Sequence, residues 1–556
     1  MKHSLWLVAA LALALRCGIA AGSLEALDRW FVPDDTYYTL GFARSLAHGL
    51  GPTLDGTVQS NGFQPLLAFL LVPVFWVTRA GDSALRAALV LGALCDVAVV
   101  VLLGTIASKL AGRSASLITA LLWAVSPLAI ANALGGLETS LALALELALV
   151  LAYIQVREHE ARTPESGASK VWATIGALSG LAILARIDAV FLVAAIALLE
   201  LPGLTSRSAG ARRRGWWIAA ICGALILLPW WSYSVVRFGT PIPESGAAVL
   251  QITSLHRARY LRVPMQLGWA AGSVLGSPFF DAPSLRELLL GNPLLSCVGF
   301  GCVNCVLLGA AFWFSFMAHN TRVERRAAAA LVLHALAVLS FYAWVLPALW
   351  FFRRYLGPCQ AVFTLLFGLW LSSAWRELRD ASARFLVRAA CGAACLAAIA
   401  LTFLGTIDLY QFVCVVPQTS RDHGLHGAKG YREVARGVLT RVPGGAILGA
   451  FQSGALSYYA PRGVRVVNLD GVVDRGAREA AAELRLSDYA RARGVTLITD
   501  WRTNLRAFAR LSKNSRALPT TRFIETEAEV QGGARYVLLE LRWPAPDAGQ
   551  RDPKLE

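Results

Sequence analysis

Two adjacent carboxylates, Asp34 and Asp35, follow the first apolar run of the chain and are well suited to acid–base chemistry. One could take a proton from an acceptor hydroxyl as general base, and the other could bind a divalent cation or orient the acceptor. Pro33 precedes the pair, and acidic residues favour the first turn of a helix. A helix start explains one carboxylate, but it explains the second, and the neighbouring Tyr37 and Tyr38, less well.

A second candidate site is the segment that begins at Trp350, in which Arg353 and Arg354 precede Tyr355. The planar fork of an arginine suits the oxygens of a phosphate. Aromatic residues and arginines at the end of an apolar run are equally typical of an anchor at the level of the lipid headgroups. Both interpretations therefore stay open for this segment.

Further polar residues stand between or beside other apolar runs. Arg186 and Asp188 are separated by one residue between two short runs, and charges at membrane depth are costly unless they are paired or line a cavity. An internal salt bridge explains this pair as well as a functional site does. In the polar C-terminal part, Asp470 and Asp474 lie where turn chemistry is the favoured explanation, and a sugar or acceptor contact is the alternative.

The surrounding composition is that of an integral membrane protein. Of 556 residues 56% are hydrophobic and 16% are charged, whereas about a quarter of an average soluble domain is charged. Apolar runs of about 20 residues recur over the first 410 positions, and each can cross a bilayer core of about 30 Å. The net charge of +16 comes largely from arginines in short loops between these runs, which indicates membrane topology rather than nucleic-acid binding.

The apolar runs predict about 11–12 membrane spans. Their approximate limits are 4–22, 87–108, 114–132, 137–156, 171–185, 188–202, 216–236, 294–317, 327–349, 356–375 and 387–408. The first run is interrupted by Arg16, which favours an uncleaved signal-anchor over a cleaved signal peptide. The segment 63–78 contains two prolines and is short, so we expect a juxtamembrane or re-entrant helix there.

Basic loops alternate with loops that carry the polar candidates. The positive-inside rule places the basic loops in the cytoplasm, so loop 23–62 and the segment after 410 face outward. Every candidate residue named above then lies on the outer side. The segment 411–545 alternates strand-like and helix-like stretches, which predicts a small α/β domain, and 546–556 has the composition of a disordered tail.

The order of these motifs is informative beyond each motif alone. Along the chain they run Asp34-Asp35, Asn61-Gly62-Phe63-Gln64-Pro65-Leu66, Gly136-Leu137-Glu138-Thr139, Arg186-Ile187-Asp188, Arg237-Phe238-Gly239, Arg353-Arg354-Tyr355 and Asn468-Leu469-Asp470-Gly471. This order resembles bacterial membrane glycosyltransferases of the GT-C superfamily, near the branch with the terminal arabinofuranosyltransferases of the mycobacterial cell wall. More distantly it is similar to protein O-mannosyltransferases and lipid A aminoarabinose transferases.

The resemblance implies a polytopic α-helical membrane protein (1–410) of GT-C type with an extracytoplasmic C-terminal α/β domain. It implies transfer of a sugar from a polyprenyl-phosphate donor to a glycan, lipid or protein at the outer face of the cytoplasmic (inner) membrane. A divalent cation stays an open option, because metal dependence varies across the superfamily. The implied roles are catalysis for Asp34 or Asp35, with the first favoured, and donor-phosphate binding for Arg353, Arg354 and Tyr355. The implied substrate contacts are Tyr37, Tyr38, Asn61, Gln64, Glu138, Arg186, Asp188 and Arg237.

Two hypotheses from other classes compete with this one. A transporter or flippase of lipid-linked sugars would also place charges such as Arg186 and Asp188 near the membrane midplane. No clear internal repeat is present, and the α/β tail suits a transferase better. A non-catalytic scaffold that holds a partner through its tail is the third hypothesis, and it leaves the acidic pair with a capping role only.

Overall fold

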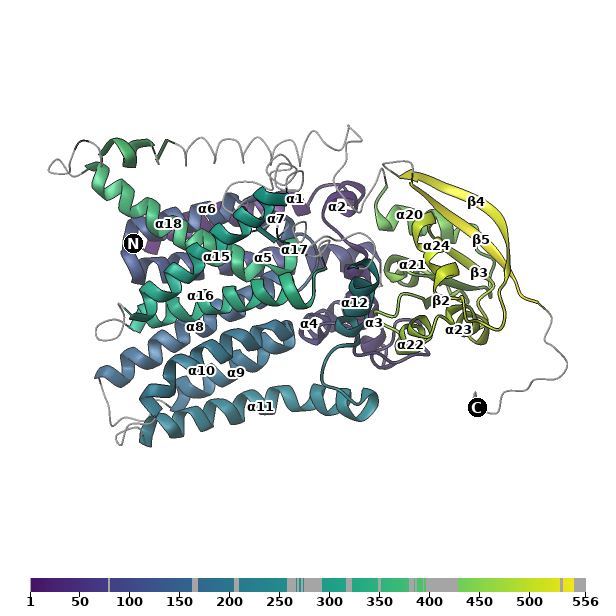
Figure 1. Cartoon of the computed structure of the whole chain (residues 1–556), viewed down its shortest axis with the longest axis horizontal. Helices are drawn as coiled ribbons and strands as arrows, with labels where there is room; N and C mark the ends of the chain where they lie inside the picture. The colour runs from purple at the N-terminus through teal and green to yellow at the C-terminus, as the bar shows by residue number, and fades with distance from the viewer. Residues whose placement is uncertain are drawn as a thin grey trace.

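The computed structural model describes residues 2–78, 81–162, 169–204, 210–257, 293–316, 323–348, 352–379, 429–530 and 534–544, with a few single positions between 267 and 274 and between 385 and 396. A bundle of long helices forms one side of the molecule and a small sheet domain forms the other (Figure 1). Most of the predicted span 387–408 and the whole predicted tail 546–556 lie outside the described residues.

The helices of the bundle follow the predicted apolar runs. The long ones are α1 (Lys2–Ala20), α5 (Asp82–Ala111), α8 (Thr139–Arg162), α9 (Ser169–Ala185), α10 (Val190–Leu204), α11 (Gly210–Phe238), α15 (Pro293–Phe316), α16 (Val323–Ser340) and α18 (Gly357–Arg379). The shorter ones are α2 (Leu24–Trp30), α3 (Asp34–Ala47), α4 (Pro65–Val77), α6 (Arg113–Val125), α7 (Pro127–Ala133), η1 (Ile187–Ala189), α12 (Glu244–Arg257), η2 (Phe341–Val345) and α17 (Phe352–Tyr355).

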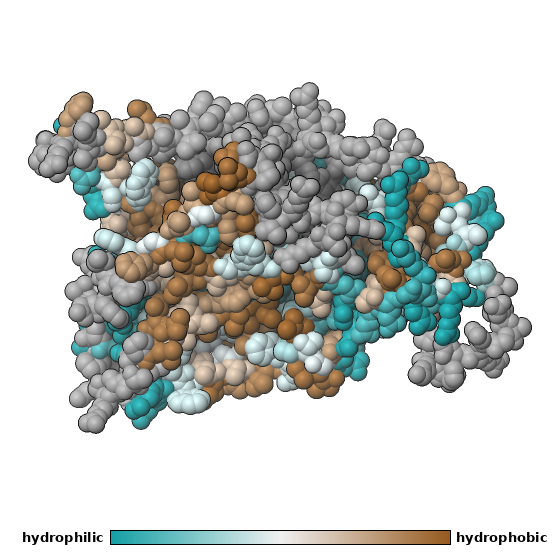
Figure 2. Space-filling model, in the orientation of Figure 1, coloured by the Kyte–Doolittle hydropathy of each residue, from teal (hydrophilic) through white to brown (hydrophobic). Residues whose placement is uncertain are grey.

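Within the described residues, seven helices are long and apolar enough to cross a membrane, and an eighth span results if α6 and α7, bent by 62°, count as one. The shorter apolar helices α4 and α9 have 13 and 17 residues. Figure 2 shows hydrophobic side chains spread over the bundle, while hydrophilic ones gather where the bundle meets the sheet domain. The prediction of a polytopic helical membrane protein is confirmed.

The segment 63–78 forms α4, as its sequence suggests, and its 13 residues span about 20 Å at 1.5 Å per residue. That length is too short for a bilayer core of about 30 Å. The helix packs against α3 and exposes Phe69, Leu70 and Trp76, while Leu67 and Leu71 are buried. Proline at the first position suits its start, because that position needs no backbone donor.

The first span is tied to the bundle by a buried ion pair. Arg16 in α1 donates to Asp96 in α5 at 2.6 Å, and both side chains are almost completely buried. The indole of Trp123 donates to the other carboxylate oxygen at 3.1 Å. The charge that interrupts the first apolar run therefore has a partner in the next span.

The C-terminal domain is a five-stranded sheet in the order β2-β1-β3-β5-β4. Its strands are β1 (Ile447–Ala450), β2 (Arg465–Asn468), β3 (Leu497–Trp501), β4 (Thr520–Val530) and β5 (Ala534–Arg542). β1 pairs in parallel with β2 and β3, and β5 pairs antiparallel with β3 and β4. Four of the strands overlap the β-rich runs of the sequence at 446–451, 464–468, 495–499 and 536–541, and no such run covers β4. The α/β prediction is confirmed.

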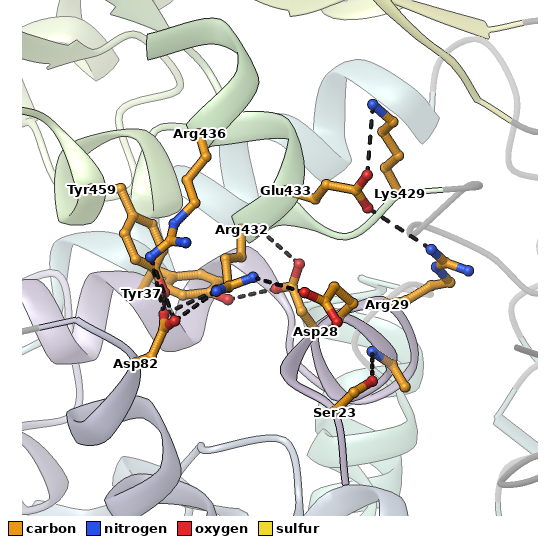
Figure 3. Close-up of polar contacts among 12 residues, drawn as sticks. Ser23, Asp28, Arg29, Tyr37, Asp82, Lys429, Arg432, Glu433, Arg436 and Tyr459 are labelled. Atoms are coloured by element: carbon orange, nitrogen blue, oxygen red, sulfur yellow. Dashed lines mark hydrogen bonds and ion pairs between the residues drawn. The ribbon is translucent and has the colours of Figure 1, made fainter. Parts of the chain in front are cut away.

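Helices α20 (Tyr431–Leu439), α21 (Gly454–Tyr459), α22 (Arg475–Ala482), α23 (Leu486–Ala492) and α24 (Arg502–Arg510) complete the domain. Of these, α20 and α21 face the bundle. Figure 3 shows the centre of that contact: Arg432 donates to Asp82 at 2.9 and 2.6 Å, and its backbone N–H donates to Asp28 at 2.8 Å. These polar contacts hold the sheet domain against α2 and the start of α5.

Candidate functional site

Asp34 begins α3 and is anchored to the sheet domain. Its two carboxylate oxygens accept hydrogen bonds from the backbone N–H groups of Gly454 and Ala455, both at 2.8 Å. These residues open α21, and a helix start offers unpaired N–H groups to an anion. The side chain is 3% exposed. Burial raises the pKa of Asp34 to about 7, against the lowering effect of the two N–H donors.

Asp35 points to a different partner, although it is the next residue. The guanidinium Nη2 of Arg354 lies 2.5 Å from its Oδ2 atom, which joins α3 to α17 across 319 positions of sequence. The Asp35 side chain keeps 27% of its surface exposed and that of Arg354 keeps 16%. Although burial disfavours the charged guanidinium, Asp35 beside it raises the pKa of Arg354, so this arginine is a fixed cation. The ion pair is therefore partly open.

A buried cluster lies behind Arg354. Arg186 donates to both oxygens of Asp188, at 3.1 and 2.5 Å, and to the backbone carbonyl of Arg354 at 3.3 Å. Tyr342, on η2, donates to Asp188 at 2.9 Å. Glu138 lies 3.7 Å from Arg186. The internal Arg186–Asp188 salt bridge is thus present, and it also braces the segment that carries Arg354.

Aromatic rings cover this cluster. The Tyr355 ring stacks on Tyr342 with centroids 4.6 Å apart, and the Arg186 guanidinium lies 5.3 Å from the centre of the Tyr355 ring. Cations over aromatic faces are held by the ring quadrupole. Arg353 belongs to α17 as well, but its side chain lies outside the described part of the structure. The sequence does not single out Tyr342 as a site residue, because its only signal is a tyrosine within an apolar run.

The two tyrosines after the acidic pair serve the domain contact. Tyr37 donates to Asp28 at 2.5 Å and lies against Tyr459 (Figure 3). Tyr38 contacts Ser453 at 3.1 Å and accepts from Asn468 at 3.2 Å. Burial raises the pKa values of both hydroxyls well above their ordinary range. Both rings are therefore neutral parts of the packing around α3.

Three other predicted substrate contacts lie in the neighbouring loops rather than beside Arg354. Asn61 accepts from the backbone N–H of Glu244 at 3.1 Å and so holds the start of α12. Gln64 directly precedes α4 and is half-buried. Arg237 is exposed and donates to Gln59 at 3.1 and 2.9 Å. These three residues therefore lie in or beside the neighbouring loops. The structure instead brings together Glu138, Arg186, Asp188, Asp35 and Arg354 in one site.

Asp470 of the sheet domain lies close to the acidic pair. It accepts from the N–H of Val472 at 2.8 Å and is half-buried. Burial, reinforced by the charges of Asp34 and Asp35, raises its pKa to about 8. Asp474, by contrast, caps α22 and accepts from Tyr489 at 2.5 Å. No group of three metal-ligating side chains occurs among the residues that the structure describes.

Comparison with known proteins places this site in context. Residues 64–233 match the family model of dolichyl-phosphate-mannose-protein mannosyltransferases. No curated protein sequence matches the chain significantly.

Solved structures match most of the chain. The oligosaccharyltransferase of Archaeoglobus fulgidus is similar over 92% of this chain and 71% of its own, with 10% identity and a TM-score of 0.56. ArnT from Cupriavidus metallidurans in the apo state is similar over 97% of this chain and 98% of its own, with 12% identity and a TM-score of 0.52. The same protein bound to undecaprenyl phosphate is similar over 96% of this chain and 98% of its own, with 13% identity and a TM-score of 0.51.

The archaeal protein has also been solved with a dolichol-phosphate and an inhibitory peptide, and with Zn and sulfate. Together the family model and the structural matches confirm the resemblance drawn from the ordered motifs. The chain has the fold of the GT-C membrane glycosyltransferases.

Proposed function

We propose that the protein transfers a sugar from a polyprenyl-phosphate donor to a hydroxyl-bearing acceptor at the outer face of the cytoplasmic membrane. The observation that carries this proposal is the ion pair of Asp35 and Arg354 at 2.5 Å, partly open on the side of the bundle that meets the sheet domain. The solved neighbours bound to undecaprenyl phosphate and to a dolichol-phosphate support a lipid-linked donor. The transporter alternative gains no support, because the matching family and the similar structures are transferases.

The pair supplies both charges that the reaction needs. The donor phosphate binds the Arg354 guanidinium, and this binding weakens the ion pair between Arg354 and Asp35. The carboxylate of Asp35 then accepts the proton of the acceptor hydroxyl. The hydroxyl oxygen bonds to the anomeric carbon, and the bond from that carbon to the phosphate oxygen breaks. Its electron pair leaves with the polyprenyl phosphate, where Arg354 stabilises the added charge.

The buried cluster keeps Arg354 in place for this step. Arg186 binds the Arg354 carbonyl and is itself held by Asp188 and Glu138. Catalytic groups must be positioned rigidly to be effective. We assign Arg186 and Asp188 as positioning residues, and we keep Arg353 and Tyr355 as further contacts of the donor phosphate.

The charge of the loops between the spans assigns the site to the outer side of the membrane in this proposal. In this proposal residues 1–410 form the membrane catalytic domain and 411–545 the soluble domain, and loop 23–62 lies outside, because the positive-inside rule places the basic loops in the cytoplasm. In oriented vesicles or intact cells, Arg462→Cys, at an exposed position, should react with a membrane-impermeant maleimide from outside, and Lys170→Cys should not. Labelling of Arg462→Cys only after lysis would contradict the outward orientation.

A transfer assay tests the reaction. Purified protein in lipid nanodiscs is given a panel of radiolabelled undecaprenyl-phosphate sugars, and both transfer and release of free sugar are measured. Arg354→Ala should lower turnover by about a hundredfold or more, as removal of a group that stabilises developing charge does, while Arg354→Lys should keep part of it.

Arg462→Ala is the matched control, because this arginine lies exposed on the sheet domain. Turnover of Arg354→Ala at the rate of the wild type would refute the role of the pair. Failure of the wild type to use any donor of the panel would refute the donor class.

A further inference from the structure

The outer end of α16 departs from regular α-helix. η2 (Phe341–Val345) is a π-helical turn, in which the Leu346 N–H donates to the Phe341 carbonyl at 3.0 Å. Pro347 follows, and because proline has no backbone N–H the helix ends here. π-helical turns are rare and occur frequently at functional sites. The side chains on this turn are therefore candidates for a role in the site.

Tyr342 is the residue of this turn that reaches the buried cluster. Its side chain is 6% exposed, whereas Trp344 of the same turn is 49% exposed. The Tyr342 hydroxyl donates to Asp188 at 2.9 Å, and the same carboxylate oxygen accepts from Arg186 at 2.5 Å. Buried polar groups need such a partner. The turn therefore directs one polar side chain inward, onto the ion pair of Arg186 and Asp188.

The ring of Tyr342 makes a second contact, with the segment that carries the phosphate-binding candidates. It stacks on Tyr355 with ring centroids 4.6 Å apart and an angle of 27° between the planes. The centre of the Tyr355 ring is 5.3 Å from the Arg186 guanidinium and 5.2 Å from the Arg354 guanidinium. Tyr342 thus supports η1 through its hydroxyl and α17 through its ring.

Neighbouring helices hold α16 directly before its π-helical turn. About two turns before Tyr342, His334 lies 3.3 Å from Glu146 of α8, and both side chains are buried. The Cys359 thiol of α18 donates to the Ala335 carbonyl at 3.2 Å. The turn therefore projects from a fixed part of the bundle, and functional side chains are positioned best by rigid elements.

We infer that Tyr342 is a positioning residue for Arg354, and this inference rests on the proposed transferase function. Its hydroxyl steadies Asp188 and Arg186, and Arg186 binds the backbone carbonyl of Arg354 at 3.3 Å. Its ring steadies Tyr355, which lies beside the Arg354 guanidinium. Tyr342 acts through these residues rather than on the donor. A guanidinium that must meet a phosphate loses effectiveness when its orientation loosens.

Two substitutions separate the hydroxyl from the ring. Tyr342→Phe keeps the stacked ring and removes only the O–H group. In nanodiscs of increasing undecaprenyl-phosphate content, its affinity for this lipid should fall about tenfold, as expected for one lost hydrogen bond to a charged group. The kcat/KM for the undecaprenyl-phosphate sugars that the wild type uses should fall by about the same factor. Tyr342→Leu also removes the ring and should lower both quantities about a hundredfold.

Tyr153→Phe is the matched control. Tyr153 is likewise buried, and its hydroxyl donates to the buried carboxylate of Glu200 at 2.5 Å. It lies in α8 about 20 Å along the helix from Glu138, and so away from the site. Its loss should lower the unfolding temperature about as much as Tyr342→Phe does. Lipid affinity and kcat/KM should both stay within about twofold of the wild type.

The outcomes distinguish this role from the reaction itself. Wild-type affinity and kcat/KM in Tyr342→Phe would overturn the positioning role. Equal losses in Tyr342→Phe and Tyr153→Phe would also overturn it, because they would indicate a general effect of lost stability. A wild type that binds undecaprenyl phosphate but uses no donor would refute the transferase, and the affinities for undecaprenyl phosphate would still decide whether Tyr342 orients the phosphate-binding arginine.

Discussion

Asp34 and Asp35 are neighbours in the chain, but α3 directs their carboxylates to different partners. Successive residues of a helix point about 100° apart around its axis, so the first carboxylate reaches α21 and the second reaches α17. This difference in partners is the basis for assigning the two carboxylates different roles in the proposed function. Asp34 acts as the anchor of the sheet domain, and Asp35 has the accessible carboxylate with a cationic partner.

The first prediction separates these roles. Asp34→Asn should lower the unfolding temperature, because an amide nitrogen cannot accept from the N–H of Gly454 or Ala455, and a lost buried hydrogen bond costs about 1–3 kcal/mol. Asp35→Asn should leave the unfolding temperature nearly unchanged and lower transfer by about a hundredfold or more. Thermal unfolding in detergent and the nanodisc transfer assay give the two measurements.

The opposite pattern would move the base to Asp34. A stable but inactive Asp34→Asn protein, together with an active Asp35→Asn protein, would show that the first carboxylate carries the chemistry and the second only holds Arg354.

At the scale of elements, the buried pair of Arg16 and Asp96 fixes α1 against α5. Removing one partner leaves an uncompensated charge in a dry environment, whereas removing both leaves a hydrophobic contact. Each of Arg16→Leu and Asp96→Leu should therefore cost about 3–5 kcal/mol of stability, and the double variant should recover much of that loss.

The unfolding temperatures of the wild type, the two single variants and the double variant in one detergent measure the coupling between Arg16 and Asp96. Additive losses in the double variant would show that the two charges act independently. A mature protein that lacks α1 would contradict the anchor directly, because Asp96 would then lose its buried partner; N-terminal sequencing decides this.

The elements themselves were largely accessible to sequence. Apolar runs gave the long helices, because each must satisfy its backbone hydrogen bonds internally in lipid. Alternating patterns gave four of the five strands. The sequence does not predict the strand β4 or the six-residue helix α21. Short or solvent-facing elements carry little periodic signal, and β4 follows a loop rather than an apolar run.

At the scale of the whole molecule, the contact between bundle and sheet domain buries several carboxyls. Burial raises the pKa of Asp28 to about 6, of Asp34 to about 7, of Asp470 to about 8 and of Asp500 to about 6, each from 3.8. The folded protein then binds more protons than the unfolded chain between about pH 4 and 8, so stability falls as the pH rises through that window.

The unfolding temperature should consequently drop by about 5 °C or more between pH 5 and pH 8.5 at constant ionic strength. Asp470→Asn should flatten the upper part of the curve, because this residue has the highest pKa of the four. Differential scanning fluorimetry across the pH range provides the measurement. A stability that rises steadily with pH would contradict the burial of these groups.

By itself, the sequence determined the membrane class, the order of most helices and the α/β character of the tail, and it predicts the outward side of the polar motifs. These properties follow from local composition and charge, which act over tens of residues. The partners of the site residues were decided only by the tertiary structure. Asp35 meets Arg354 across 319 positions, and Asp34 meets α21 from the other domain, because packing of the bundle and docking of the sheet bring together groups that no local pattern connects.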